Sequence, residues 1–324
     1  MTTARTVPVT IEMDGDELDA EDAWRELRKV GVRRLAVDAF IRFRFGDGFS
    51  SSRALALQAS LAVVPFLLAL TGLVADIDEE RPARVLASTV AAISPGSGGS
   101  DAMAGALRGS SASELSGEIA LWLGLLFALL SMTTAMAQIE RGTNRIYGIR
   151  RDRPARAKYG RAAVLTLVLA LPVGLGFLLL VAGGAFGDAM AVDYGWSEDF
   201  IDGWNWFRWP VGIALLVITI AVVLNHSPRR RQPGLTWLAG GAAVAVALNL
   251  VSTGLLALYV HESPSFGDVY GPLAGIFALL LWALISSMAL FYGAALCAQL
   301  EACRAGHHEP AYDDPGRPHG VRLS

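Results

Sequence analysis

The chain has 324 residues, of which 53% are hydrophobic and 18% charged, with 34 glycines and a formal net charge of −3. Soluble domains carry about 25% charged residues and about 45–50% apolar residues with glycine included. A soluble globule of this size cannot bury so much apolar surface, so the composition predicts helices that face lipid. The two cysteines, Cys297 and Cys303, are too few for a disulfide framework, and their spacing does not fit a zinc ribbon.

The N-terminal region is divided into an acidic tail and a helical segment. Residues 1–23 contain one base, Arg5, and seven acids without an apolar run, which predicts a disordered tail rather than a signal peptide. From Trp24 to Phe45 apolar residues recur at helical spacing and arginines fill the other positions. A basic amphipathic helix of this kind suits the membrane interface, and a soluble helix that caps a bundle is the alternative.

Six long apolar stretches follow. All but the fourth comfortably reach the roughly 20 residues that cross the hydrocarbon core, and none has a charged residue or histidine in its central portion. We therefore predict an all-α polytopic membrane protein, with a membrane domain over 24–300 and a disordered tail over 301–324. The predicted spans are 55–75, 119–139, 162–186, 207–224, 235–260 and 272–296. A further helix is expected over Pro82–Ile93, between the first two spans.

The basic residues predict the orientation of these spans. With both termini in the cytoplasm, 23 of the 27 lysines and arginines fall in segments on the cytoplasmic side and four fall outside. Basic residues concentrate in cytoplasmic loops of membrane proteins, so we expect a bacterial inner-membrane protein with both ends inside. The same rule explains the basic segment Arg141–Arg161 without nucleic acid, since each base gains about 1 kcal/mol near anionic headgroups.

Residues that could perform chemistry are scarce. Hydrolysis needs a general base, a metal cluster or an activated nucleophile, and the sequence places none of these together. Three histidines, His307, His308 and His319, lie in the tail among a few acids, where a functional metal site is not expected. We therefore expect no enzyme activity and no cofactor.

Uncharged polar residues inside the spans are more informative, because unpaired polar groups are costly in lipid. They serve either as hydrogen bonds between helices or as the lining of a path for a polar substrate. Pro65 should bend the first span and free backbone carbonyls there. The candidate residues are Gln58, Pro65, Thr133, Gln138, Asn249, Ser252 and Ser286.

Several motifs in this order resemble the YihY/BrkB family of membrane proteins, once named for ribonuclease BN. The resemblance rests on 54-ALALQAS-60 leading to Pro65, on 144-NRIYG-148 after the second span, on 258-LYV-260 and on 270-YGPL-273. Trp282 and 293-GA-294 complete it, so that the matching residues include Asn144, Tyr147, Gly148, Tyr259, Tyr270, Gly271, Trp282 and Gly293. The resemblance implies a six-helix inner-membrane protein without a settled biochemical activity. This chain has Ala295 where the family often has a glutamate, so no mechanism is expected to rest on that carboxylate.

From these residues we expect a transporter-like protein that handles an amphipathic or lipid-like substrate. The alternative is a structural or scaffolding protein that recruits partners or anionic lipid through its basic cytoplasmic face. Membrane lipids are expected partners and nucleic acid is not, and whether the chain forms a homo-oligomer stays open.

Overall fold

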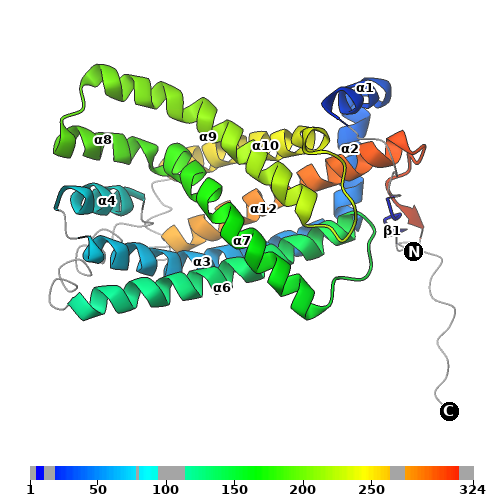
Figure 1. The fold of residues 1–324 in the computed structure, drawn as a ribbon. Coiled ribbons are helices and arrows are strands. Elements are labelled where there is room, and N and C mark those ends of the chain that lie inside the picture. Colours follow the sequence, from blue (N-terminus) through cyan, green and yellow to red (C-terminus); the bar gives the residue numbers. More distant parts are fainter. Residues whose placement is uncertain (1–4, 11–18, 78–79, 94–113, 263–273, 314–324) are drawn as a thin grey trace, which may run out of the picture.

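The computed structural model describes residues 5–10, 19–77, 80–93, 114–262 and 274–313. The long helices run roughly along one direction, and both described termini lie at the same end of the bundle (Figure 1). We call this end the terminal end. The opposite end carries helix α4 (Glu80–Ile93), which confirms the helix expected over Pro82–Ile93 and packs against α8 (Gly183–Tyr194).

Within the described residues, six helical segments are long and apolar enough to cross a membrane, which confirms the predicted number. Each predicted span covers only the apolar part of a helix, the part that can lie in the hydrocarbon core. Most of the helices therefore extend beyond the predicted spans. They are α3 (Gly48–Asp76), α6 (Glu114–Ile146), α7 (Ala155–Phe177) with its continuation to Tyr194, α9 (Glu198–His226), α10 (Leu235–Glu262) and α12 (Ala274–Arg304).

The third membrane segment contains a π-helical turn. Helix α7 passes through η1 (Leu178–Ala182) and continues into α8. A π-turn leaves backbone carbonyls displaced from the regular ladder, and Arg208 of α9 donates from Nη1 to the Leu179 oxygen at 3.3 Å. Trp204 of α9 donates to the Gly183 oxygen at 2.7 Å. Side chains of α9 therefore satisfy the carbonyls at this irregularity.

The structure at the terminal end differs in two ways from what the sequence predicts for the N-terminal helix and the two tails. The segment expected as one helix over 24–45 is two helices, α1 (Ala20–Val30) and α2 (Val32–Phe45), because Gly31 has φ +84°, a conformation that interrupts a helix. The expected disorder of the tails does not hold for their described parts. Strand β1 (Arg5–Thr6) pairs antiparallel with β2 (Tyr312–Asp313), and an ion pair joins Arg5 to Asp313 at 3.4 Å.

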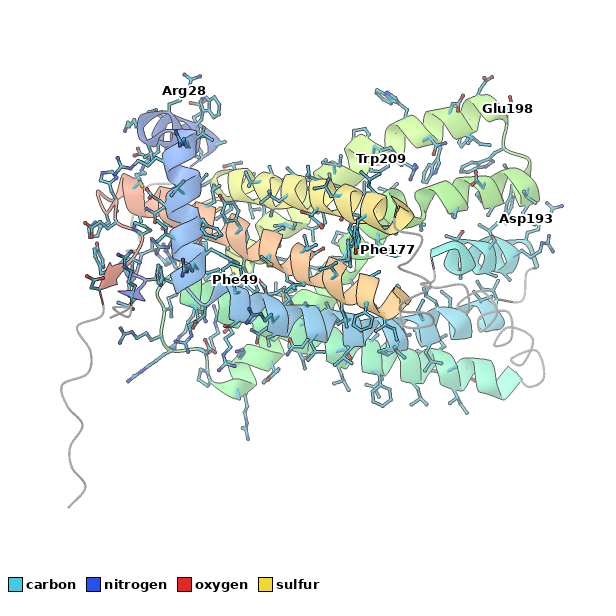
Figure 2. All side chains as sticks on the ribbon, turned by 180° about the vertical axis from the view of Figure 1, so that it is seen from behind. Arg28, Phe49, Phe177, Asp193, Glu198 and Trp209 are labelled. Carbon is cyan, nitrogen blue, oxygen red and sulfur yellow. The ribbon has the colours of Figure 1, made fainter. Side chains whose placement is uncertain are left out.

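Helix packing concentrates the core near the terminal end. Helix α12 packs against α10, α3 and α2, and α3 runs along α6. Helix α2 lies across the ends of the spans in both views (Figures 1 and 2). The large buried side chains here include Trp237, Tyr147 and Phe291. This arrangement surrounds several charged side chains with apolar ones.

Candidate functional site

A network of buried polar side chains joins the two ends of the chain to the bundle. Its centre is Arg42 of α2, which is fully buried. Arg42 donates from Nε to the Ile146 oxygen at 2.9 Å and from Nη1 to Gln299 Oε1 at 3.2 Å. Its Nη2 donates to the Pro8 oxygen at 3.1 Å and to the Thr10 hydroxyl. Burial lowers the pKa of Arg42 to about 10, so it stays charged at neutral pH.

A buried ion pair lies next to Arg42. Arg230, between α9 and α10, binds Glu301 near the end of α12, and both side chains are almost fully buried. The Arg230 guanidinium also lies over the Tyr147 ring at 5.0 Å. Burial holds the pKa of the Tyr147 phenol well above its usual range, so this ring is a neutral platform for the guanidinium. Two charges that lose their water need such close partners.

Asn144 connects the same end of α6 to two loops. Its amide donates to Asp152 Oδ1 at 3.1 Å and its carbonyl oxygen accepts from the Arg229 backbone N–H at 2.7 Å. Glu140, one turn earlier on α6, binds Arg153 at 2.9 Å. Arg153 also donates to the carbonyl oxygens of residues 227 and 228. These bonds bring the basic segment Arg141–Arg161 and the connection between α9 and α10 together at the terminal end.

A second, uncharged cluster lies between α10 and α12. Ser286 donates to Asn249 Oδ1 at 2.9 Å, and Trp282 Nε1 donates to the Thr253 hydroxyl at 3.1 Å. Thr253 lies 3.4 Å from the same Asn249 oxygen. Asn249 and Ser286 both lie near the middle of their helices, and all four side chains are half-buried. The cluster bonds the two helices, yet its side chains remain partly reachable from outside.

Close backbone contact holds the same two helices together nearer the terminal end. A Cβ added at Gly293 would lie 2.6 Å from the Gly241 oxygen, and one added at Gly241 would lie 2.6 Å from the Gly293 oxygen. Gly148, after α6, has φ +77°, and a Cβ there would lie 2.5 Å from the Pro8 oxygen. Glycine is therefore required at Gly148 both by its backbone conformation and by the N-terminal segment that crosses it.

The remaining predicted residues are dispersed. Gln58 and Pro65 are half-buried on α3, and the buried Gln58 Oε1 has no hydrogen-bond partner within the described residues. Thr133 and Gln138 are half-buried on α6, as is Ser252 on α10. Tyr259 is exposed. Tyr270 and Gly271 lie outside the described residues.

The sequence analysis missed the network around Arg42, because its partners are far apart along the chain. Arg42 and Gln299 are separated by 257 positions. A weak signal of burial was present in the short run 7-VPVT-10 and in the final turn of α12. Both places have apolar and uncharged polar residues among the charged residues of the tails. Among the described residues, no group of three or more His, Cys, Asp or Glu side chains could hold a metal ion.

Comparison with known proteins identifies the family. The family model described as "Virulence factor BrkB" matches residues 39–316. The chain belongs to the BrkB family. Similar proteins include the ribonuclease-like protein YfkH of Bacillus subtilis, 25% identical over 180 residues, which cover 56% of this chain and 65% of YfkH. A UPF0761 membrane protein of Pseudomonas aeruginosa (strain LESB58) is 28% identical over 56% of this chain and 43% of its own length.

A third relative, a UPF0761 membrane protein of Chromohalobacter salexigens, is 28% identical over 80% of this chain and 61% of its own length. The chain therefore spans less than two thirds of the length of these relatives. No solved structure shows significant similarity to it. The family match confirms the resemblance drawn from the sequence motifs, and BrkB membership together with six apolar helices makes this chain a multi-pass membrane protein.

Proposed function

We propose that this BrkB-family chain moves an amphipathic or lipid-like substrate past the uncharged polar side chains of α10 and α12, without catalysing a chemical step. The observation that carries the proposal is the half-buried cluster of Asn249, Thr253, Trp282 and Ser286. A polar headgroup crossing the hydrocarbon core needs hydrogen-bond partners there, because unpaired polar groups are costly in lipid. Uncharged partners supply them without holding the headgroup as tightly as a fixed charge would.

Helix α3 supports the same reading. Gln58 Oε1 and Ser60 Oγ are buried and have no hydrogen-bond partner within the described residues. Each oxygen retains the capacity to accept a hydrogen bond from a passing polar group. Pro65, one to two turns further along α3, removes one backbone donor and so frees a carbonyl in the same membrane segment.

We further propose that the terminal end faces the cytoplasm of a bacterial inner membrane. Asn144, Arg153 and Arg230 join the basic segments of the chain at this one end. Basic segments on one side of a multi-pass protein are typical of the cytoplasmic side. A cysteine introduced at exposed Arg151 should react with an impermeant thiol reagent only after the cells are opened.

The absence of an enzymatic step is part of the proposal. The two carboxylates at the inner ends of α6 and α12, Glu140 and Glu301, are each ion-paired with a buried or half-buried arginine. Such pairing engages each carboxylate in a contact that holds the fold together. Purified protein incubated with RNA should leave it intact. RNA cleavage that is lost in Glu140→Gln or Glu301→Gln would contradict this part.

Proteoliposomes that contain NBD-labelled phosphatidylglycerol test the transport proposal. Dithionite reduces the label in the outer leaflet only. The protein should therefore increase the fraction of inner-leaflet label that reaches the outer leaflet and is reduced. The double variant Asn249→Leu/Ser286→Ala removes both members of the bonded pair, so neither is left unpaired. We expect it to slow lipid movement about threefold to tenfold, the rate equivalent of about 0.6–1.4 kcal/mol.

A matched control is Thr219→Val in α9. Thr219 is buried and donates to the Leu215 oxygen of its own helix at 2.7 Å, so this variant removes a polar group from a span without touching the cluster. It should leave lipid movement unchanged. Equal rates in the native chain, the double variant and protein-free liposomes would overturn the proposal, as would a loss of movement matched by Thr219→Val.

A further inference from the structure

Helices α1 and α2 meet at Gly31, and both expose arginines together with large apolar side chains. Trp24, Val32, Val37 and Phe40 are 56%, 68%, 53% and 47% exposed. The exposed basic residues beside them are Arg25, Arg28, Lys29, Arg33, Arg34 and Arg44. We call these ten residues the elbow surface. Exposed apolar side chains in this number, bordered by charges, are typical of a binding surface rather than of a face turned to water.

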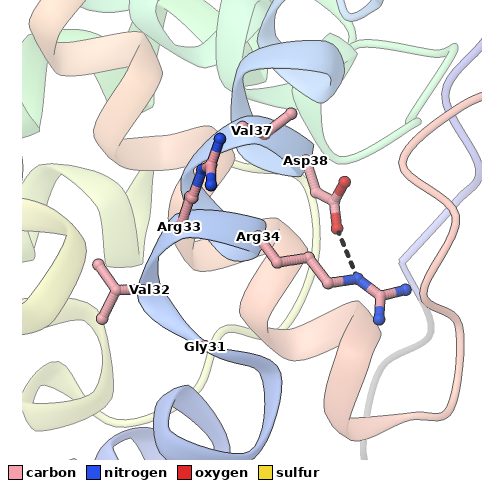
Figure 3. A pocket seen from close by; sticks show the side chains of 6 residues that line it. All are labelled: Gly31, Val32, Arg33, Arg34, Val37 and Asp38. Carbon is pink, nitrogen blue, oxygen red and sulfur yellow. Dashed lines mark ion pairs between the residues drawn. The ribbon is translucent and has the colours of Figure 1, made fainter.

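The elbow surface is hollowed where α2 begins. Residues Gly31–Arg34, Val37 and Asp38 line an open groove of about 580 Å³. Figure 3 shows that Val32, Arg33 and Arg34 spread from the first turn of α2, with Arg34 turned toward Asp38. Most of the accessible lining is apolar, and Arg33 and Arg34 are among the residues that line it. The groove thus combines apolar surface with arginine side chains.

Acidic side chains near the groove are largely engaged by bases. Asp22 binds Arg25 and Arg304 at 3.3 and 3.1 Å, and Glu26 binds Lys29 at 3.1 Å. Asp38 lies 3.7 Å from Arg34, and Glu21 is exposed at the start of α1. Within the described residues, Arg28, Arg33 and Arg44 have no ion pair. Arg28 lies over the Trp24 ring at 5.0 Å, and Figure 2 shows it at the outer edge of α1. A positive charge therefore remains available on this surface.

The position of the elbow surface decides which partner it meets. Helix α2 crosses the ends of the spans, and α1 sits beside the bundle at the terminal end (Figure 1). Helix α3 begins at Gly48, directly after α2, and α1 packs against α10 and α12. Because the first apolar span starts at Gly48, we expect a surface at this level, beside the bundle, to lie where lipid headgroups meet water. Aromatic and aliphatic side chains can enter the acyl boundary there while arginines reach the phosphates.

We propose that the elbow surface is a binding site for anionic phospholipid, with the phosphate held by Arg28 and Arg33 and the acyl chains against Val32, Val37 and Phe40. Charge complementarity selects an anionic over a zwitterionic headgroup, and the exposed apolar side chains select a lipid over a free phosphate. This site is separate from the α10–α12 cluster, so it stands whether or not the protein moves lipid.

Lipid binding can be measured on the full chain purified in a neutral detergent. Native mass spectrometry during titration with phosphatidylglycerol, and separately with phosphatidylcholine, gives the affinity for each lipid. Each base near an anionic lipid contributes about 1 kcal/mol, or roughly a fivefold change in affinity. The variant Arg28→Gln/Arg33→Gln should therefore weaken phosphatidylglycerol binding by about tenfold or more. Binding of phosphatidylcholine should not change, and added salt should weaken the native interaction.

The matched control is Arg150→Gln/Arg151→Gln, which removes two exposed arginines from the connection between α6 and α7 at the same end. It should bind phosphatidylglycerol like the native chain. Unchanged binding in the elbow variant, or an equal loss in the control, would overturn the proposal. A melting temperature within a few degrees of native confirms that both variants are folded.

A second variant, Val37→Ser/Phe40→Ser, separates lipid from protein as the occupant. It should weaken phosphatidylglycerol binding and leave the mass of the protein particle in detergent unchanged. A shift of the native particle from dimer to monomer in this variant, with lipid binding intact, would instead assign the elbow surface to contact between two copies of the chain and overturn the lipid assignment.

Discussion

The terminal end and the membrane interior of this bundle are held together by different interactions. At the terminal end, Arg42 and the Arg230–Glu301 pair are almost fully buried and bonded to several segments. In the interior, α10 and α12 are bonded through a half-buried cluster without charge, and two glycines hold these helices together between that cluster and the terminal end. Burying a charged group is costly unless several partners bond it, whereas burying part of an uncharged polar group costs less. The terminal end is thus fixed by several directed contacts between buried groups, and the interior retains polar groups that are only half-buried.

The largest effect is expected from Arg42→Met. This variant removes four donated hydrogen bonds and leaves buried acceptors on Ile146, Gln299 and Pro8 without their donor. Each buried unsatisfied group costs about 1–3 kcal/mol, so we expect a loss of at least about 3 kcal/mol. Hydrogen exchange at the Thr10 amide, which donates to the Tyr147 oxygen, should become faster together with a lower melting temperature.

The control for Arg42→Met is Arg44→Met, two positions along α2. Arg44 is exposed and lies over the Phe45 ring at 5.5 Å, so its loss should change stability by about 0.5 kcal/mol or less. Arg42→Lys should recover only part of the stability, because an ammonium cannot reach the four acceptors in the planar geometry of a guanidinium. Similar melting temperatures for Arg42→Met and Arg44→Met would refute a structural role for the network.

A smaller effect is expected from Gly241→Ala, where α10 and α12 are in close contact. The added methyl would meet Cys297 Sγ and the Gly293 carbonyl, so α10 and α12 must separate. Overpacking of this kind costs about 1–3 kcal/mol. The neighbouring variant Gly240→Ala meets nothing within 4 Å and should be neutral or slightly stabilising, since alanine favours the helix. Thermal melting of both variants checks this, and equal values would contradict close packing at Gly241.

The spans could be predicted from the sequence because hydrocarbon imposes a local rule, a run of about 20 apolar residues in one segment. The same rule identified Asn249 and Ser286, since polar residues stand out in such a run. Their pairing required the antiparallel placement of α10 against α12, which no local pattern encodes. The sequence analysis therefore left open whether they bond helices or line a path.

The terminal end was not predictable in the same way. Arg42 occupies a position that an amphipathic pattern assigns to water, and its burial depends on residues 8–10 and on Gln299 near the other end of the chain. The break at Gly31 had a local signal, because glycine interrupts helices. Apolar residues nevertheless recur at helical spacing on both sides of it, so the pattern predicted one helix. Long-range polar contacts of this kind follow from the fold and carry no periodic signature.

The smallest effect is expected from acid acting on Asp152, which belongs to the terminal end. Burial raises the pKa of Asp152, but hydrogen bonds from Asn144 and Lys158 at 3.1 Å and the charge of Arg141 outweigh it, so the pKa lies below its usual range. A lowered folded-state pKa stabilises the protein above about pH 4, the unfolded value, and this stability is lost as the pH falls through the folded-state pKa.

Asp152→Asn should therefore melt below the native chain at pH 7, by the equivalent of about 1 kcal/mol or less, because the carboxylate is partly exposed. The gap should close as the pH falls below 4. The matched control is Asp202→Asn, which removes an exposed carboxylate near the start of α9. A gap for Asp152→Asn that stays constant from pH 7 to acid would show that this carboxylate contributes no charge-dependent stability.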